Sequence, residues 1–234
     1  MIKPIVYPND LKKTSSPWFR EVILGGQDGL VNVLGIILGI TAASGQHHII
    51  VAASLAAAFA EAVSMGAVNY TSTLAQRDFY LFEESKENKE IKERPQEEKD
   101  EIYWIFYNKG FRGKFLKEVV KKISSEKDIW LKIMMEDELN LQPVFTKNLL
   151  KSSFVVGAAT IVGSLVPVLP YFIFQGSTAL YLSLIISGIT LFFVGAAEAK
   201  SLVGSWWKSG LQMLLIGLGA ALIGFFIGQF FHAN

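Results

Sequence analysis

The stretch VILGGQDGLVNVLGIILGITAA, residues 22–43, decides the fold, because it is long and apolar and holds a single charged residue, Asp28. A helix of about 20 predominantly apolar residues crosses a hydrocarbon core of about 30 Å. In lipid the backbone polar groups must be hydrogen-bonded within the segment, so a run of this length is predicted to be helical. Similar runs follow at residues 49–74, 152–174, 178–197 and 211–231. The sequence therefore predicts an all-α membrane protein with five transmembrane helices.

The composition of the whole chain agrees with this prediction. Of its 234 residues, 51% are hydrophobic and only 18% are charged, and the mean hydropathy is +0.35. An ordinary soluble domain has about 25% charged residues. The chain has no cysteine, which excludes a disulfide scaffold, a thiolate zinc site and an iron–sulfur cluster.

The charged residues are gathered in one block. Residues 74–151 hold 16 of the 21 acidic and 16 of the 22 basic residues, and no run there is apolar enough to span a membrane. Strong helix formers dominate the block, which predicts a compact lobe of three or four helices. We therefore divide the chain into an N-terminal segment (1–21), transmembrane helices one and two (22–74), a charged helical domain (75–150) and transmembrane helices three to five (151–231).

The orientation follows from the basic residues that flank the apolar runs. Loops 44–48 and 175–177 and the tail 232–234 contain no lysine or arginine. The basic residues outside the block lie before the first run or between the last two, namely Lys3, Lys12, Lys13, Arg20, Lys200 and Lys208. The positive-inside rule then puts the N-terminus and the inserted domain in the cytoplasm and the C-terminus outside. The first twenty residues do not have the pattern of a signal peptide, and the compact length favours a prokaryotic plasma membrane.

Polar side chains interrupt the first two apolar runs. Asp28 lies about two turns into the first run with Asn32 close by, and Glu61 lies four residues before Met65, so that these two share a helix face. Acids within a membrane usually face a polar pathway or a partner. A carboxylate together with a thioether suits iron(II), cobalt(II) or zinc(II), with manganese(II) tolerated. The alternatives are a proton relay, or a packing methionine with Glu61 bonded to a serine or threonine. We interpret Glu21 and Glu198 as interfacial charges.

The charged block repeats a spacing of three between possible metal ligands. Residues three apart share a helix face, so each helix here can present two ligands to one centre. The pairs are Glu87 with Glu90, Glu98 with Glu101, and Met135 with Glu138; further candidates are Met134, Glu84, Glu93, Glu97 and Glu136. The alternative is an ordinary solvated face in which glutamates alternate with lysines, with methionine as a core filler.

Several functional classes are excluded by missing motifs. A di-iron centre of the ferritin type needs Glu-x-x-His pairs on two helices, and the three histidines, His47, His48 and His232, all lie outside the block. Phosphate loops, nucleophile elbows and dinucleotide fingerprints are missing, and no unbalanced basic patch indicates nucleic acid. We therefore expect neither an enzyme nor a permanent cofactor.

The order of motifs along the chain resembles the vacuolar iron transporter family from about Arg20 to Gly228. The resemblance rests on the Glu-rich insert and on five motifs: REVILGGQDGLVNVLGIILG (20–39), AEAVSMGAVNYTS (60–72), IMMEDELNL (133–141), LVPVLPYF (165–172) and MLLIGLGAALIGFFIG (213–228). It implies five transmembrane helices, a cytoplasmic metal-binding domain between helices two and three, and a homodimer with its ion path at the subunit interface. It also implies export of iron(II), often with manganese(II), in exchange for protons.

The resemblance also assigns roles to individual residues. It makes Asp28 the pathway carboxylate of helix one and Met65 the pathway thioether of helix two. In the insert it implies a set of ligands that collect ions: Glu87, Glu90, Glu98, Glu101, Met134, Met135 and Glu138. One position departs from the pattern, because Asn69 stands where many members have a carboxylate, and Glu61 is the candidate to compensate.

The resulting hypothesis is a proton-coupled exporter of divalent transition metal, for metal homeostasis and detoxification. Fe2+ is the expected cargo, with Mn2+, Co2+ and Zn2+ as alternatives, and Asp28, Glu61, Met65 and Asn32 form the transport and proton-coupling path. Two rival functions are a membrane-anchored metal-binding or sensing protein without transport, and a passive cation channel. Dependence of the flux on a pH gradient separates the exporter from the channel.

Overall fold

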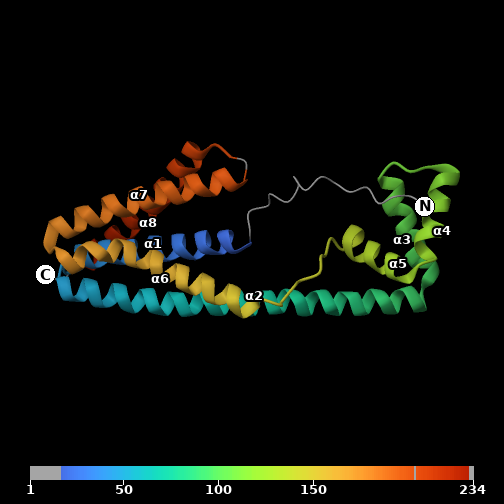
Figure 1. Cartoon of the computed structure of the whole chain (residues 1–234), viewed down its shortest axis with the longest axis horizontal. Helices are drawn as coiled ribbons and strands as arrows, with labels where there is room; N and C mark the ends of the chain where they lie inside the picture. Colours follow the sequence, from blue (N-terminus) through green and yellow to red (C-terminus); the bar gives the residue numbers. More distant parts are fainter. Residues whose placement is uncertain (1–16, 203, 232–234) are drawn as a thin grey trace. The chain divides into compact units, whose positions relative to one another are not determined.

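The computed structural model describes residues 17–202 and 204–231, and its regular elements there are helices (Figure 1). Lys3, Lys12, Lys13 and His232, used above to predict orientation and to exclude a di-iron site, lie outside the described residues. The elements are α1 (Pro17–Ala43), α2 (His47–Glu93), α3 (Pro95–Asn108), α4 (Gly113–Ser124), α5 (Lys127–Ile133), the π-helical turn η2 (Met134–Glu138), α6 (Leu149–Ile173), α7 (Gly176–Leu202) and α8 (Trp206–Phe230).

The five predicted membrane helices are present. Helices α1, α2, α6, α7 and α8 are each long and apolar enough to cross a membrane. The chain divides into two compact units: the described residues up to Tyr70 and from Leu150 onward, here the membrane unit, and Thr71–Leu149, here the insert unit. The insert unit begins within α2 and ends at Leu149, the first residue of α6, and its cytoplasmic location stays a prediction.

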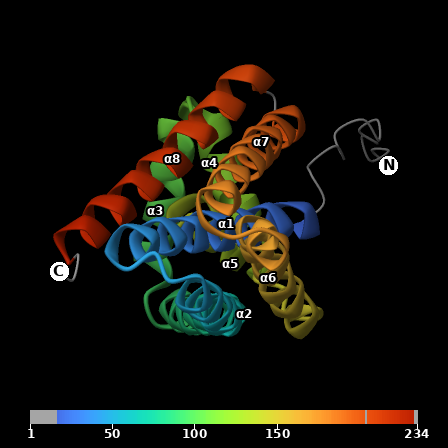
Figure 2. The ribbon, with the colours of Figure 1, turned by 90° about the vertical axis from the view of Figure 1, so that its left-hand side faces the viewer.

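Helix α1 is the central element of the membrane unit (Figure 2). It packs on α8 with no side chain between the backbones, because Gly35 faces Gly224 and Gly39 faces Gly228. The four-residue spacing of glycines in each helix predicts this packing face. Against α6, the close approach uses Gly26 of α1 and lies opposite Gly163. Small residues thus bring the helices together where side chains would keep them apart.

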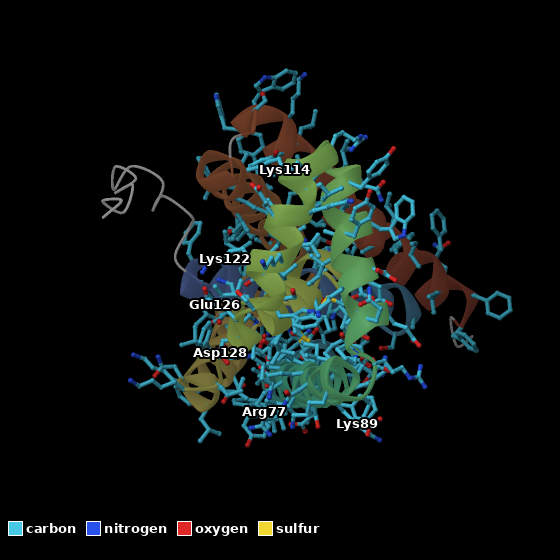
Figure 3. The ribbon with its side chains drawn as sticks, turned by 90° about the vertical axis from the view of Figure 1, so that its right-hand side faces the viewer. Arg77, Lys89, Lys114, Lys122, Glu126 and Asp128 are labelled. Carbon is cyan, nitrogen blue, oxygen red and sulfur yellow. The ribbon has the colours of Figure 1, made fainter. Side chains whose placement is uncertain are left out.

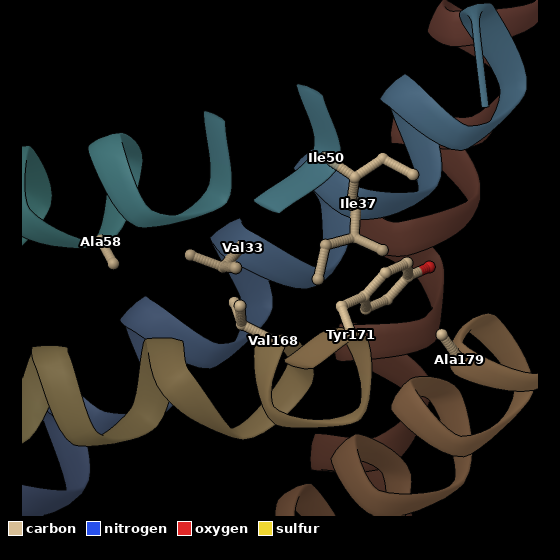
Figure 4. Close-up of a cluster of buried hydrophobic side chains, with 7 residues drawn as sticks. All are labelled: Val33, Ile37, Ile50, Ala58, Val168, Tyr171 and Ala179. Carbon is tan, nitrogen blue, oxygen red and sulfur yellow. The ribbon is translucent and has the colours of Figure 1, made fainter. Parts of the chain in front are cut away.

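Branched and aromatic side chains fill the remaining space at one end of the membrane unit (Figure 4). Val33 and Ile37 of α1 are fully buried there, and Tyr171 of α6 is 3% exposed. The cluster is completed by Ile50, Ala58, Val168 and Ala179, from α2, α6 and α7. It therefore joins four of the five apolar helices into one core.

The outer surface of the membrane unit is apolar. Phe154 of α6, Phe193 of α7 and Phe226 of α8 are each about two-thirds exposed or more. Large exposed apolar side chains at this density fit contact with acyl chains and do not fit a water-exposed surface.

Pro167 and Pro170 lie near the end of the third apolar run, and proline inside a helix is predicted to kink or end it. Helix α6 continues through both prolines and ends at Ile173, three residues after Pro170. Proline leaves a carbonyl in the preceding turn without its helical donor and disturbs the local packing. The carbonyl of Pro167 itself accepts a hydrogen bond from the buried Ser183 hydroxyl of α7 (2.7 Å), which ties this part of α6 to its neighbour.

The insert unit is a small bundle built on the C-terminal part of α2. Its core contains Ile91 of α2, Ile102 of α3, Ile123 of α4, Trp130 of α5 and Met134 of η2. Helix α2 ends at Glu93 because Pro95 disfavours a helical conformation at the residue before it. Helix α5 is regular only to Ile133 and continues directly as the π-helical turn η2.

Candidate functional site

Three of the predicted pathway residues meet between α1 and α2. The side-chain amide of Asn32 on α1 donates a hydrogen bond to Oε1 of Glu61 on α2. Asp28, one turn before Asn32, lies within hydrogen-bonding and Coulombic reach of the same carboxylate. The partner of Glu61 is therefore an amide, and not the serine or threonine hydroxyl of the alternative interpretation. Two helices contribute one carboxylate each to this group, which we call the intramembrane cluster (Asp28, Asn32, Glu61).

The intramembrane cluster is open at the surface of the single chain. Asn32 is exposed and Asp28 and Glu61 are half-buried, although the surrounding helices are apolar. Met65, one turn beyond Glu61 on α2, is also half-buried. Ionisable groups in a membrane avoid lipid and face a cavity or a partner. The arrangement therefore fits a polar path that something other than acyl chains must cover.

A second polar network near Asn69 was not predicted from the sequence. The Asn69 amide donates to the hydroxyls of Ser152 (3.0 Å) and Ser153 (3.1 Å) on α6. Ser152 in turn donates to Oε1 of Glu21 on α1 at 2.6 Å. Asn69 thus links three helices through hydroxyl groups. The paired serines at the start of an apolar run were the only local signal for this network.

Five glutamates chosen from their spacing lie close enough in the insert unit to influence one another. Glu87 of α2 and Glu98 of α3 are buried, at 3% and 5% exposed. Burial raises the pKa of the Glu98 carboxyl to about 7, helped by the negative charges of Glu101, Glu87, Glu138 and Glu90. Burial, with the charges of Glu90, Glu101 and Glu83, also raises the pKa of Glu87, and Lys86 partly opposes the shift. We call Glu87, Glu90, Glu98, Glu101 and Glu138 the glutamate cluster.

The glutamate cluster is energetically costly for the insert unit. Oε2 of Glu98 is buried and has no hydrogen-bond partner in the described structure. The pKa of Glu138 is raised to about 7 as well, by burial of its carboxyl group and by Glu101 and Glu87, although the residue as a whole is exposed. Buried carboxylates that lack hydrogen-bond donors and sufficient positive charge lower the stability of the fold. A bound cation would offset that loss.

The two methionines of η2 differ in their surroundings. Met134 is fully buried among the core residues of the insert unit, which matches the core-filler interpretation. Met135 is 1% exposed and is not part of that core cluster. A π-helical turn re-aims consecutive side chains and is frequent at functional sites. The turn lies at the predicted ligands Met134, Met135 and Glu138, whose ligand role stays a prediction.

The further glutamate candidates behave as solvated charges. Glu93 pairs with Lys89, Glu97 with Arg94 and Glu136 with Lys132, all at 3.6–3.9 Å on exposed helix faces. Glu84 accepts a hydrogen bond from Tyr80 within α2 at 3.5 Å. Exposed pairs of this kind contribute little to stability. The structure therefore separates the glutamate cluster from its solvated neighbours, a distinction that spacing alone did not make.

Neither cluster forms a complete metal site within one chain. In residues 17–202 and 204–231, no group of three or more histidine, aspartate or glutamate side chains has the geometry to hold a metal ion. The ligand and pathway roles of the residues named above therefore stay predictions.

Comparison with known proteins agrees with the resemblance seen in the motifs. The sequence pattern of the VIT family matches residues 19–229. The chain is 31% identical over 213 residues to vacuolar iron transporter 1 of Eucalyptus grandis, covering 91% of this chain and 86% of that protein. It is 30% identical to the vacuolar iron transporter of Plasmodium falciparum (isolate 3D7), covering 92% and 82%.

Members of this family are transporters and not enzymes, and their apolar helices make them integral membrane proteins. From the match over nearly its whole length, the chain belongs to the VIT family.

Proposed function

We propose that this protein exports divalent transition metal from the cytoplasm in exchange for protons, with iron(II) as its main cargo and manganese(II) as a second. The observation that carries the proposal is the intramembrane cluster, in which carboxylates from two candidate membrane helices share a polar group. The proposal also rests on membership of a transporter family and on relatives named for iron transport.

The cost of the intramembrane cluster supports a role in transport. A charged side chain in the middle of a bilayer costs roughly 2.5–3.5 kcal/mol on insertion scales. Helices that only anchor a protein do not need charged side chains in the bilayer. A path that removes water from a cation needs them as oxygen ligands. Asp28 and Glu61 lie close enough for their charges to repel each other, and an arriving metal ion compensates that repulsion. Protonation from the outer side then weakens the site and releases the ion. Binding must stay modest for the ion to leave.

The glutamate cluster supports a role in collecting the cargo. Its carboxylates raise the local cation concentration, and Glu98 and Glu138, with pKa values of about 7, release protons when a metal binds near neutral pH. Basic residues around the apolar runs support a cytoplasmic position for this unit. Cargo would therefore be captured on the side from which it is exported.

The exposure of the intramembrane cluster supports a homodimer. Asn32 is exposed on the single chain although it lies in a membrane helix. A second copy related by a two-fold axis would cover it and bring a second Asp28 and Met65 to the same path. Two carboxylates and two thioethers would then complete a site that one chain leaves open.

The test is anaerobic metal flux into proteoliposomes that hold the purified protein. Wild type should carry iron(II) into the vesicles faster when the lumen is more acidic than the outside solution, because protons then flow out as the metal enters. Asp28→Asn should lower that flux at least about 100-fold while keeping the same elution volume and helical content. Glu198→Gln, which removes a carboxylate elsewhere in the membrane unit, should transport normally. The same assay with manganese(II), cobalt(II) and zinc(II) ranks the cargoes.

Each rival function predicts a different result. Flux that does not respond to the pH gradient identifies a passive channel. Iron binding without flux in wild type identifies a membrane-anchored binding protein. Full flux in Asp28→Asn removes the intramembrane cluster from the mechanism.

A further inference from the structure

The insert unit carries an aromatic and basic surface that transport chemistry does not use. Helices α3 and α4 meet at a turn where Gly110 has φ +99°, and aromatic side chains gather there. The rings of Trp104 and Tyr107 lie 5.4 Å apart, and those of Phe111 and Phe115 lie 5.5 Å apart in a stacked arrangement. Trp104 is 58% exposed and Phe115 is 61% exposed. Exposed aromatic side chains that contact each other mark an interaction site in a unit with its own core.

Positive charge surrounds these rings. The guanidinium of Arg112 lies 3.6 Å from the centre of the Tyr107 ring and donates to the carbonyl oxygen of Phe111 at 2.7 Å. Residues 109–122 contain six basic residues and one acidic residue, Glu118. We call Trp104, Tyr107, Phe111, Arg112 and Phe115, with the lysines of α4, the aromatic–basic surface.

Of the four lysines of α4, Lys114 pairs with Glu118 at 3.8 Å, and two others are free to bind an outside partner. The buried residues Leu116 and Ile123 face the core, which leaves the other faces of α4 to solvent. Lys117 and Lys121 are exposed and form no ion pair with any residue that the structure describes. Figure 3 shows Lys114 and Lys122 on the same helix, and Lys122 pairs with Glu126. The positive charge of α4 is thus only partly neutralised within the insert unit.

Charge is divided unevenly within the insert unit, and this division indicates the partner. The glutamate cluster lies on α2, α3 and η2, whereas α4 carries lysines. The balance of charges over the whole insert hides this separation. An isologous contact between two copies would place α4 lysines against each other, which is unfavourable. Aromatic rings combined with lysine and arginine are typical of surfaces that bind anionic headgroups.

We propose that the aromatic–basic surface docks on anionic lipid headgroups, with Trp104 and Phe115 entering the interface and the α4 lysines binding lipid phosphate. The same chain carries five candidate membrane spans, so a lipid surface accompanies the insert unit wherever the protein resides. Each basic residue near an anionic surface adds attraction that falls off within a Debye length. Docking of this kind does not depend on metal transport and goes beyond the proposed function.

The test uses the full chain, which has no cysteine, so that a single introduced cysteine is labelled uniquely. Phe115→Cys carries an environment-sensitive fluorophore in nanodiscs of phosphatidylcholine alone or mixed with phosphatidylglycerol, each with a nitroxide-bearing headgroup lipid as quencher. Asp128→Cys, an exposed position on α5, is the labelled control. We expect quenching at position 115 only in the anionic nanodiscs, and none at position 128 in either.

Charge reversal and salt then test the electrostatic part. Adding Lys117→Glu and Lys121→Glu should lower the equilibrium constant for docking by about ten-fold. The matched reversal Lys89→Glu with Lys92→Glu on α2 should leave that constant unchanged. Raising the ionic strength to about 1 M, where the Debye length is about 3 Å, should abolish quenching in the unmutated background. That salt measurement does not depend on the folding of any charge variant.

Three results overturn the proposal. Equal quenching at position 115 in neutral and anionic nanodiscs excludes recognition of lipid charge. Protection of the label that requires two copies in one nanodisc, with no headgroup quenching, assigns the surface to a second copy of the chain. If the label is neither quenched nor protected in anionic nanodiscs, the aromatic–basic surface does not bind the membrane.

Discussion

The membrane unit and the insert unit are packed in different ways. In the membrane unit, helices touch through glycines, as where Gly228 meets Gly39, and the buried polar side chains carry uncharged hydroxyl groups. In the insert unit, large side chains such as Ile102 and Trp130 fill the core, and the glutamate cluster forms beside them. The glycine contacts of the membrane unit have no room for added atoms, whereas the insert unit holds charges that its own fold disfavours.

This difference indicates where each unit departs from maximal stability. Close backbone packing in the membrane unit gains dispersion contacts that any larger side chain would remove. The insert unit buries Glu98 with an unpartnered oxygen among other carboxylates, which lowers its stability until a cation binds. Substitutions in the two units should therefore change stability with opposite signs, and three measurements test that contrast.

The largest effect is expected from Gly228→Val in α8. A Cβ at this position would fall inside the contact distance of the Gly39 carbonyl oxygen on α1, and backbone atoms cannot move away as a side chain can. Overpacking costs typically 1–3 kcal/mol and more where the backbone must shift, so the thermal midpoint in detergent micelles should fall by about 6–12 °C. In the same helix, Gly219→Val is the matched control, because no atom lies within 4 Å of its Cβ position. Equal midpoints for the two variants would show that α1 and α8 do not pack through this glycine pair.

The sequence was sufficient to predict a packing face on each of these two helices, but not that the two faces meet, nor which polar groups pair near them. Gly35, Gly39, Gly224 and Gly228 repeat at a spacing of four, which defines a helix face without knowledge of the partner helix. The hydrogen bond from Asn32 to Glu61 depends on how α1 and α2 are rotated against each other, which periodicity does not determine. The Asn69 network with Ser152 joins residues far apart in sequence and was missed for the same reason.

In the insert unit, the helices followed from composition and proline positions, while the state of each glutamate did not. Glu97 and Glu98 are neighbours with the same local composition, yet one is exposed beside Arg94 and the other is buried. Neighbouring residues on an α-helix are rotated by about 100° from each other, so Glu97 and Glu98 point to different faces. Only the packing of α3 on α2 decides which of the two enters the cluster. The π-helical turn at Met134 likewise has no local sequence signal.

A smaller and opposite effect is expected from Glu98→Gln. Removing the buried charge relieves repulsion from Glu101 and Glu87, so at pH 8 the insert unit should gain about 1 kcal/mol of stability. Amide hydrogen exchange in α3 and α4 should then slow about five-fold, while iron(II) affinity falls. Glu97→Gln, beside it on the exposed face, should change neither quantity. Faster exchange in Glu98→Gln would mean that this carboxylate stabilises the unit, and the contrast between the two units would fail.

An effect of the same size is expected in the response of the wild-type insert unit to pH. The pKa of Glu98 is about 7 in the folded protein, against an ordinary value of 4.5, so between these values the folded state binds more protons than the unfolded state. Stability must then rise as pH falls through this window, and going from pH 8 to pH 6 should add about 1 kcal/mol in metal-free buffer. Hydrogen exchange in α3 and α4, corrected for the intrinsic rate at each pH, measures this change, and Glu98→Gln should reduce it while Gly219→Val leaves it intact. If stability falls on acidification instead, the charged carboxylates are paired and stabilise the insert unit. A bound cation would then have no destabilisation to remove.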